Sequence, residues 1–148
     1  MKDYEIFDLG DIKLLSGKIL KSGKITYKTY GALNKNFDNA IVLPTFYTGT
    51  HKRNEGFFGP GRAIDPNKYF IISINMFGNG LSSSPSNSSN QQDGPRFPEI
   101  TLWDNIYCQH KLITEKLKIK NKKNSFSGWL VNGWLSSLSM GSSISRYG

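Results

Sequence analysis

The sequence predicts an α/β fold, in which a parallel sheet is covered by a helix. Two short runs, residues 40–43 and 69–74, are almost wholly apolar, as strands buried on both faces of a sheet are. A helical pattern follows over residues 102–117, and another apolar stretch lies at residues 126–132. Strands and helix in this order favour a right-handed crossover, and therefore parallel strands.

A leading strand is expected at residues 24–30. β-Branched and aromatic residues alternate there with Lys24, Thr26 and Lys28, as in a strand with one buried face, and Gly31 ends the pattern. Residues 34–39 have the Asn, Lys and Asp content of a turn and precede the first buried strand.

A polar surface loop is expected at residues 82–98. Its first twelve residues are almost entirely Ser, Asn, Gln and Pro, which cannot bury enough apolar surface to form regular structure. The glycines just before it, Gly78 and Gly80, resemble part of a dinucleotide-binding fingerprint, but no helix pattern follows them. We interpret them as a turn and expect no bound cofactor.

The covering helix has a recognisable start. The Thr101 hydroxyl stands three residues before the Asp104 carboxylate, a spacing in which each side chain can bind the other's main-chain N–H. The apolar residues of the helix return to one side at a period of 3.6; they are Leu102, Ile106, Ile113 and Leu117. We expect this side to pack on the sheet.

Net charge alone would suggest a nucleic-acid partner, since 19 Lys and Arg face 11 Asp and Glu, for a formal charge of +8. The densest group of lysines, residues 116–123, follows the predicted helix, where cations suit the negative end of the helix dipole. No aromatic residue lies among them to stack on bases. We therefore interpret the group as solvated surface. Nucleic-acid binding stays as an alternative that would weaken steeply with salt.

Other classes of protein are disfavoured by what the sequence lacks. Charged residues interrupt the first ten positions, and no stretch is long and apolar enough for a signal peptide or a membrane span. The one cysteine, Cys108, has no partner for an internal disulfide, and no Cys/His cluster has metal-ligand spacing. We expect a soluble cytoplasmic protein without a metal.

A serine motif follows the last predicted strand. In the G-x-S-x-G pattern, a sharp strand-to-helix turn exposes a nucleophilic serine and needs small neighbours. Here Ser139 and Gly141 fit the pattern, whereas Ser137 replaces the first glycine. This region is so rich in Ser and Gly that, taken by itself, the motif is better explained as a serine-rich loop.

Longer blocks carry a resemblance to a known family. Together they resemble the homoserine O-acetyltransferase-like α/β-hydrolases, over about residues 14–109 and less closely to residue 141. The blocks are residues 27–31, 44–51, 58–65, 69–87 and 94–98. The resemblance implies that residues 1–148 are the N-terminal part of an α/β-hydrolase-fold domain, apparently truncated.

The resemblance also implies a chemistry. Ser139 would be the catalytic nucleophile, taking an acyl group from acetyl-CoA or another acyl-CoA and passing it to the hydroxyl of homoserine or a similar alcohol. The backbone N–H groups of Tyr47 and Met140 would form the oxyanion hole. Methionine biosynthesis and a homodimer are further implications of the family.

This sequence departs from the family pattern at two points. Residues 135–138 separate Gly133 and Trp134 from the serine motif, although the family runs directly from one to the other. The family's acid and histidine lie further downstream, so the triad Asp and His are missing from this chain, and we expect the isolated chain to be inactive. Its two histidines, His51 and His110, have no catalytic role in the family pattern, although the first lies close enough to the expected pocket to be considered as a substitute base.

Three alternatives therefore remain open. The same serine could serve an esterase, in which water replaces the alcohol acceptor. The chain could be an inactive truncated remnant. It could also be a subunit that needs a complementing chain.

Overall fold

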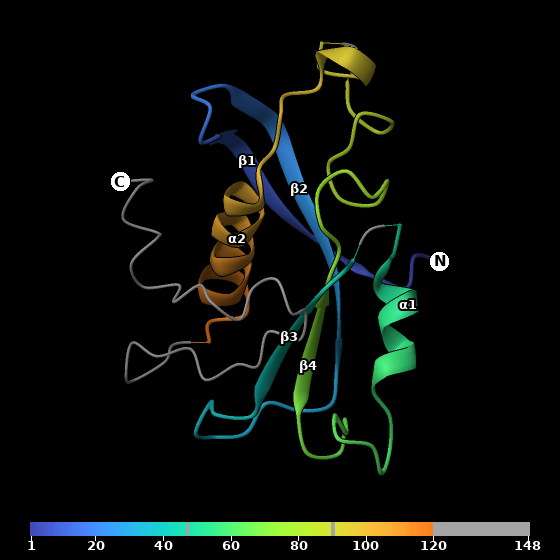
Figure 1. Ribbon diagram of the computed structural model, residues 1–148. Coiled ribbons are helices and arrows are strands. Elements are labelled where there is room, and N and C mark those ends of the chain that lie inside the picture. The colour runs from blue at the N-terminus through green and yellow to red at the C-terminus, as the bar shows by residue number, and fades with distance from the viewer. Residues whose placement is uncertain (47, 90, 120–148) are drawn as a thin grey trace.

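A computed structural model describes residues 1–46, 48–89 and 91–119 (Figure 1). Within them lies a four-stranded mixed sheet of order β1-β2-β4-β3. The antiparallel neighbours are β1 with β2 and β2 with β4, whereas β3 and β4 are parallel. The strands are β1 (Glu5–Lys13), β2 (Ile19–Tyr30), β3 (Ala40–Pro44) and β4 (Phe70–Ile74).

The predicted parallel pair is confirmed, because β3 and β4 coincide with the two buried apolar runs and pair in parallel register. The leading strand is confirmed but longer than the pattern indicates, since β2 begins at Ile19. Residues 19–27 of β2 pair with β1, and the local apolar pattern does not predict this pairing. The apolar stretch at residues 126–132 lies outside the described residues.

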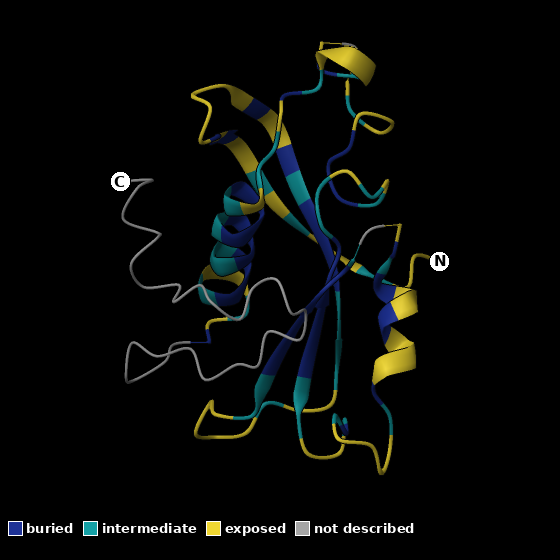
Figure 2. Cartoon of the chain, viewed as in Figure 1, coloured by how far each residue is buried: buried dark blue, intermediate teal, exposed yellow. Residues whose placement is uncertain are grey.

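The two faces of the sheet carry separate cores, because successive side chains of a strand point to opposite faces. On one face, Val42, Ile72 and Ile74 pack with Cys108 and Leu112 from the covering helical segment. On the other face, the alternate strand residues pack with Phe58; they are Ile41, Leu43 and Ile71. Strands β3 and β4 are therefore buried on both faces, whereas much of β1 is exposed (Figure 2).

The covering helix begins where its capping signal predicts. Helix α2 (Leu102–Lys111) has Thr101 as N-cap, and a complete capping box joins Thr101 and Asp104. The predicted apolar side is wrong at one position: Leu102, in the first turn, is 39% exposed, whereas Ile106 and Ile113 are buried. After α2 the chain continues as a π-helix, η3 (Leu112–Lys116), in which the amide of Leu117 donates to the carbonyl of Leu112.

A short helical segment lies on the opposite side of the sheet from α2 (Figure 1). It comprises α1 (His51–Asn54) and the 3₁₀ helix η1 (Glu55–Phe57). The side chain of Asn54 fixes it to the sheet, because its Nδ2 donates to the Leu43 carbonyl at 3.0 Å and to Ser73 Oγ at 2.9 Å. The last residue of α1 is thereby held beside β3 and β4.

The loop of residues 82–98 contains one 3₁₀ helix, η2 (Gly94–Arg96), and is otherwise irregular where it is described. Its opening residues are buried, unlike those of a surface loop. The reason is a hydrogen-bonding role: Ser82 Oγ and Ser83 Oγ each accept an amide N–H of β2, from Thr26 and Lys24, at 2.9 Å. These serines cover the part of β2 that β4 does not reach.

Candidate active site at the carboxyl edge of the sheet

Strands β3 and β4 end at the same edge of the sheet, because they are parallel. In open α/β sheets, ligands bind outside the carboxyl ends of the strands. The chain leaves this edge through Thr45 and Asn75, both buried. The amide of Thr45 donates to the Ile74 carbonyl at 2.8 Å, and its Oγ1 accepts from the Met76 amide at 3.0 Å. The two strand ends are thus fastened to each other.

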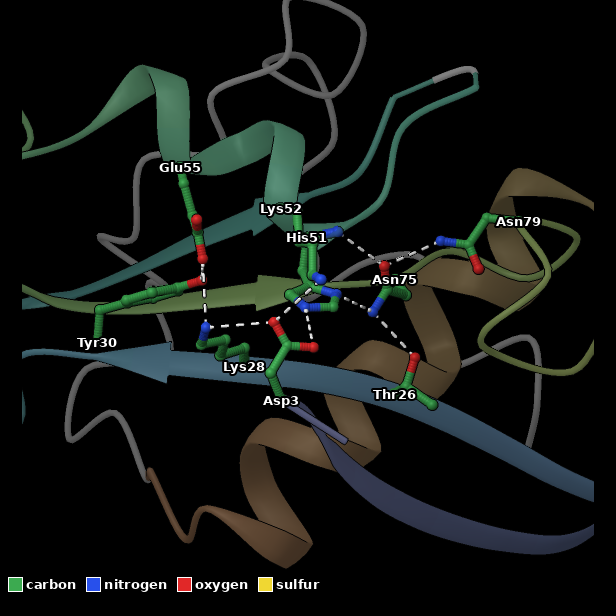
Figure 3. Close-up of polar contacts among 9 residues, drawn as sticks. All are labelled: Asp3, Thr26, Lys28, Tyr30, His51, Lys52, Glu55, Asn75 and Asn79. Atoms are coloured by element: carbon green, nitrogen blue, oxygen red, sulfur yellow. Dashed lines mark hydrogen bonds and ion pairs between the residues drawn. The ribbon is translucent and has the colours of Figure 1, made fainter. Parts of the chain in front are cut away.

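Asn75 is the centre of a buried polar network at this edge (Figure 3). Its Oδ1 accepts from the amide of His51 at 2.9 Å and from Nδ2 of Asn79 at 3.0 Å. Its Nδ2 lies 2.9 Å from Thr26 Oγ1 and 3.1 Å from His51 Nδ1. One amide side chain therefore joins β2, β4, the start of α1 and the turn after β4.

His51 extends this network to the N-terminal segment (Figure 3). Its side chain is 1% exposed, and its Nε2 lies 3.4 Å from Oδ1 of Asp3. The second carboxylate oxygen of Asp3 lies 3.7 Å from Lys28 Nζ and 3.6 Å from Lys52 Nζ. Burial raises the pKa of Asp3, but the contact with His51 and the neighbouring positive charges outweigh burial, so its pKa lies below the usual value.

This geometry bears on His51 as a substitute base. Its Nδ1 faces the Asn75 amide, and its Nε2 faces the Asp3 carboxylate. Because both ring nitrogens face protein groups and the ring is buried, His51 does not present a free basic nitrogen to a substrate. The structure therefore gives this histidine a structural place in the network rather than a catalytic one.

A second carboxylate, that of Glu55, lies in the α1–η1 segment. Glu55 Oε1 accepts from the Tyr30 hydroxyl at 2.7 Å and lies 3.3 Å from Lys28 Nζ. The hydrogen bond from Tyr30 is the main reason why the pKa of Glu55 is lowered, while burial raises the pKa of Tyr30. Asp3 and Glu55 share Lys28 as a neighbour, so these charges fasten the chain's N-terminal residues to the α1–η1 segment.

The loop between β3 and α1 is bent and held on both sides of Tyr47. The amide of Gly49 donates to the Phe46 carbonyl at 2.9 Å, and Nδ2 of Asn79 reaches the Gly49 carbonyl at 3.4 Å. Thr48 has a φ of +63°, a left-handed conformation that is strained for a β-branched residue. Such strain persists where the surrounding contacts enforce it, and it occurs often at active sites.

The catalytic and oxyanion residues expected from the sequence, Ser139, Met140 and Tyr47, lie outside the described residues. What the structure adds is a set of side chains that bind the described residues before and after Tyr47 and that sequence reasoning missed: Thr45, Asn75 and Asn79. A usable signal was present, because Thr45 and Asn75 are the polar residues close behind two buried apolar runs. Residues at such positions meet at one edge when the strands are parallel.

The rest of the described chain offers no second reactive centre of the usual kinds. Burial, aided by the charge of Asp104, raises the pKa of the Cys108 thiol to about 12, so this cysteine is not an activated nucleophile. The described residues contain no group of three or more His, Cys, Asp or Glu arranged to hold a metal ion. Among their helices, none combines the length and apolar character that crossing a membrane requires.

The amino-acid sequence is similar to those of known esterases and acetyltransferases. The chain is 40% identical over 119 residues to an ethyl acetate hydrolase of Pseudomonas veronii. It is 35% identical over 134 residues to a homoserine O-acetyltransferase of Pelobacter propionicus. These alignments cover 80% and 79% of this chain.

Among solved structures, the acetyl esterase MekB superposes with a TM-score of 0.77 at 40% sequence identity, over 80% of this chain and 34% of that one. The chain belongs to the homoserine O-acetyltransferase-like α/β-hydrolases. The sheet and covering helix are accordingly an incomplete α/β-hydrolase fold. No family model matches the sequence.

The chain spans about a third of the length of the curated relatives it matches, 34% of the hydrolase and 36% of the acetyltransferase. This partial coverage fits the N-terminal portion of the family's domain that the sequence blocks imply. Within that portion, the described structure provides the carboxyl edge and the loop on which the family resemblance puts one oxyanion donor.

Proposed function

We propose that this chain carries the nucleophile and the oxyanion-binding groups of a serine acyltransferase. In the proposed reaction, Ser139 Oγ attacks the carbonyl carbon of an acyl-CoA thioester, the C–S bond breaks, and CoA leaves as the thiol. The acyl-serine then transfers its acyl group to the hydroxyl of homoserine or a similar alcohol, which restores the serine. The backbone N–H groups of Tyr47 and Met140 stabilise the oxyanion of each tetrahedral intermediate.

The observation that supports the proposal best is the fixed main chain on both sides of Tyr47. An oxyanion hole works because its donors are held in position before the reaction, so that no reorganisation is needed when charge develops. The described residues on either side of Tyr47 support the proposal, because Thr45, Gly49 and His51 are held at the carboxyl edge by hydrogen bonds with Met76, Asn79 and Asn75. The proposal includes acetyl-CoA as donor, a cytoplasmic location, a role in methionine biosynthesis and a homodimer, in keeping with the family.

An esterase is the second candidate, with water in place of the alcohol. The observation that favours it is the 40% identity to an ethyl acetate hydrolase and to the acetyl esterase MekB. Both candidates use the same acyl-serine and differ only in the acceptor. An experiment that distinguishes them must therefore follow where the acyl group goes after the acyl-serine has formed.

The first experiment tests the acyl-serine itself. The chain is incubated with p-nitrophenyl acetate, whose leaving group departs without needing an acid, and acetylated peptides are identified by mass spectrometry. Because the chain lacks the triad Asp and His, we expect no catalytic turnover but a slow, single acetylation of Ser139 by this activated ester. The acetylation should be lost in Ser139→Ala and retained in the control Ser137→Ala, which removes a neighbouring hydroxyl. Acetylation spread evenly over serines, or confined to lysines, would show that Ser139 is not the nucleophile.

The second experiment identifies the acceptor. The acetylated chain is freed of excess ester and incubated with and without homoserine, and both O-acetylhomoserine and acetate are measured. An acyltransferase forms O-acetylhomoserine at the expense of acetate. Release of acetate at a rate that homoserine does not change would instead support the esterase.

A further inference from the structure

We infer that Asn75 is a positioning residue for the oxyanion loop, acting through His51 and Asn79 rather than by touching the substrate. The inference rests on the proposed function, because it concerns the loop that carries the proposed donor Tyr47. The first observation is the orientation of the Asn75 side-chain amide, which the neighbouring groups determine.

The orientation follows from the main-chain N–H of His51. This group can only donate, so the Asn75 atom that lies 2.9 Å from it must be the oxygen Oδ1. The nitrogen Nδ2 therefore faces the imidazole ring at 3.1 Å from Nδ1. Because Nδ2 is a donor, Nδ1 of His51 must accept.

The same step fixes the tautomer of His51. A neutral ring whose Nδ1 accepts carries its hydrogen on Nε2. Nε2 is buried and has no well-aligned hydrogen bond within the described residues; the acceptor it faces is Oδ1 of Asp3, at 3.4 Å. An order of donors and acceptors thus runs from Asn75 through the His51 ring to Asp3.

The loop is restrained at several points that lead back to Asn75. At its end, the His51 amide binds Asn75 directly. In the middle, the Gly49 carbonyl accepts from Asn79, whose Nδ2 also donates to Asn75. Since both contacts use Oδ1 of Asn75, removal of this oxygen frees the loop at two points on the same side of Tyr47.

Displacement of an oxyanion N–H donor should lower the rate of Ser139 acylation but not the affinity for the ester. A reacting group misplaced by about 1 Å can lower a rate about a hundredfold. Loss of an interaction made only in the transition state lowers the maximal rate and leaves KM unchanged. Loss of the positioning amide should therefore reduce the maximal rate of Ser139 acylation without weakening ester binding.

Two substitutions separate positioning from folding. Asn75→Ala removes the whole amide, whereas Asn75→Asp keeps Oδ1 for His51 and Asn79 and replaces only the donor Nδ2 by an acceptor oxygen. The acceptor oxygen then requires a proton on Nδ1 of His51. The control is Asn39→Ala, an asparagine that binds the Ala32 and Lys68 carbonyls near the opposite end of β3.

The decisive measurement of the network is independent of activity. The ring ¹⁵N shifts of His51 in the unmodified chain should show the hydrogen on Nε2, and Asn75→Asp should move a proton to Nδ1. A wild-type ring with its hydrogen on Nδ1 would overturn the inference whatever happens at Ser139.

The kinetic measurement is the rate of Ser139 acetylation as a function of p-nitrophenyl acetate concentration. For Asn75→Ala we expect a maximal rate lower by about ten- to a hundredfold with KM changed less than about twofold. Asn75→Asp should stay within about threefold of the wild type, like the control. If Asn75→Ala does not fold, the Asp variant carries the test: a switched His51 proton with the rate retained supports positioning, and a switched proton with the rate lost contradicts it.

The two proposals fail in different ways. No acetylation of Ser139 in any variant, with the expected His51 tautomer, would refute the proposed function but leave the hydrogen-bond network intact. Equal acetylation rates in the wild type and a folded Asn75→Ala would refute the positioning role but leave the function intact.

Discussion

Gly31, directly after β2, has a backbone conformation that lets the turn before β4 pack against the end of β2. Its φ is +75°, and a Cβ atom there would clash with the main-chain carbonyl oxygens of Pro66 and Tyr69. Neither oxygen belongs to a side chain that could rotate away. The turn before β4 can therefore pack against the end of β2 only if residue 31 is glycine.

We predict that Gly31→Ala lowers the free energy of unfolding by about 2–4 kcal/mol, combining left-handed strain with the clash. The measurement is urea denaturation followed by circular dichroism. Gly17→Ala is the control, because Gly17 has a similar φ of +87° but open space around its Cβ position. It should cost only about 1–2 kcal/mol. Equal losses in the two variants would mean that the close approach at Gly31 contributes nothing.

At the scale of the element, the two α-helices of the described residues differ in how they begin. Helix α2 has a capping box, in which the Thr101 amide donates to Asp104 Oδ2 at 2.8 Å and the Asp104 amide donates to Thr101 Oγ1 at 3.3 Å. Helix α1 also starts after a threonine, Thr50, but that side chain makes no capping hydrogen bond. The start of α1 is fixed instead by the bond between its first amide, that of His51, and Asn75.

This difference gives a matched pair of variants. Thr101→Ala should lower the free energy of unfolding by about 1 kcal/mol, because it removes the hydroxyl that accepts from the Asp104 amide and donates to the Asp104 carboxylate. Thr50→Ala removes the same atoms without breaking a cap and should change stability by less than about 0.5 kcal/mol. Urea midpoints of both variants test this, and a larger loss at Thr50 would contradict it.

At the scale of the whole molecule, acid stability depends on carboxylates that the fold stabilises in their charged form. The pKa of Asp65 is lowered chiefly by the amides of Gly61 and Asn67, which donate to it at 2.9 and 2.8 Å. The pKa values of Asp3 and Glu55 are lowered as well. A folded state with lowered pKa values binds fewer protons than the unfolded chain, so it is most favoured above the unfolded values of 3.8 and 4.5.

We therefore predict that the free energy of unfolding falls as the pH drops from 5 towards 3, through the lowered pKa values of the folded state. The formal charge of +8 at pH 7 strengthens the trend, because each protonated carboxylate adds to the positive self-repulsion. Urea denaturation at pH 7, 5, 4 and 3 measures it. Asp65→Asn should show a smaller loss in acid, and the control Glu99→Gln, at an exposed carboxylate, should keep the wild-type slope. An unchanged slope in Asp65→Asn would show that its amide contacts do not stabilise the charged form.

Much of the fold was predictable because its signals are local. The strands β3 and β4 are continuous apolar runs, and α2 begins at a capping box written within four residues. The extension of β2 and its pairing with β1 were not predictable, since a hairpin strand with exposed positions leaves a weak pattern. The π-helical end of α2 and the exposure of Leu102 also depend on packing rather than on period.

The sequence by itself determined the α/β class, the parallel pair and, through resemblance, the family and the proposed roles of Ser139, Tyr47 and Met140. Only the tertiary structure decided which side chains hold the loop at the carboxyl edge. Asn75 binds His51 across 24 residues and Thr26 across 49, and no pattern in the chain records such a contact. The physical reason is that apolar periodicity and capping act between near neighbours, whereas a buried amide is satisfied by whichever strands and helices the fold brings to it.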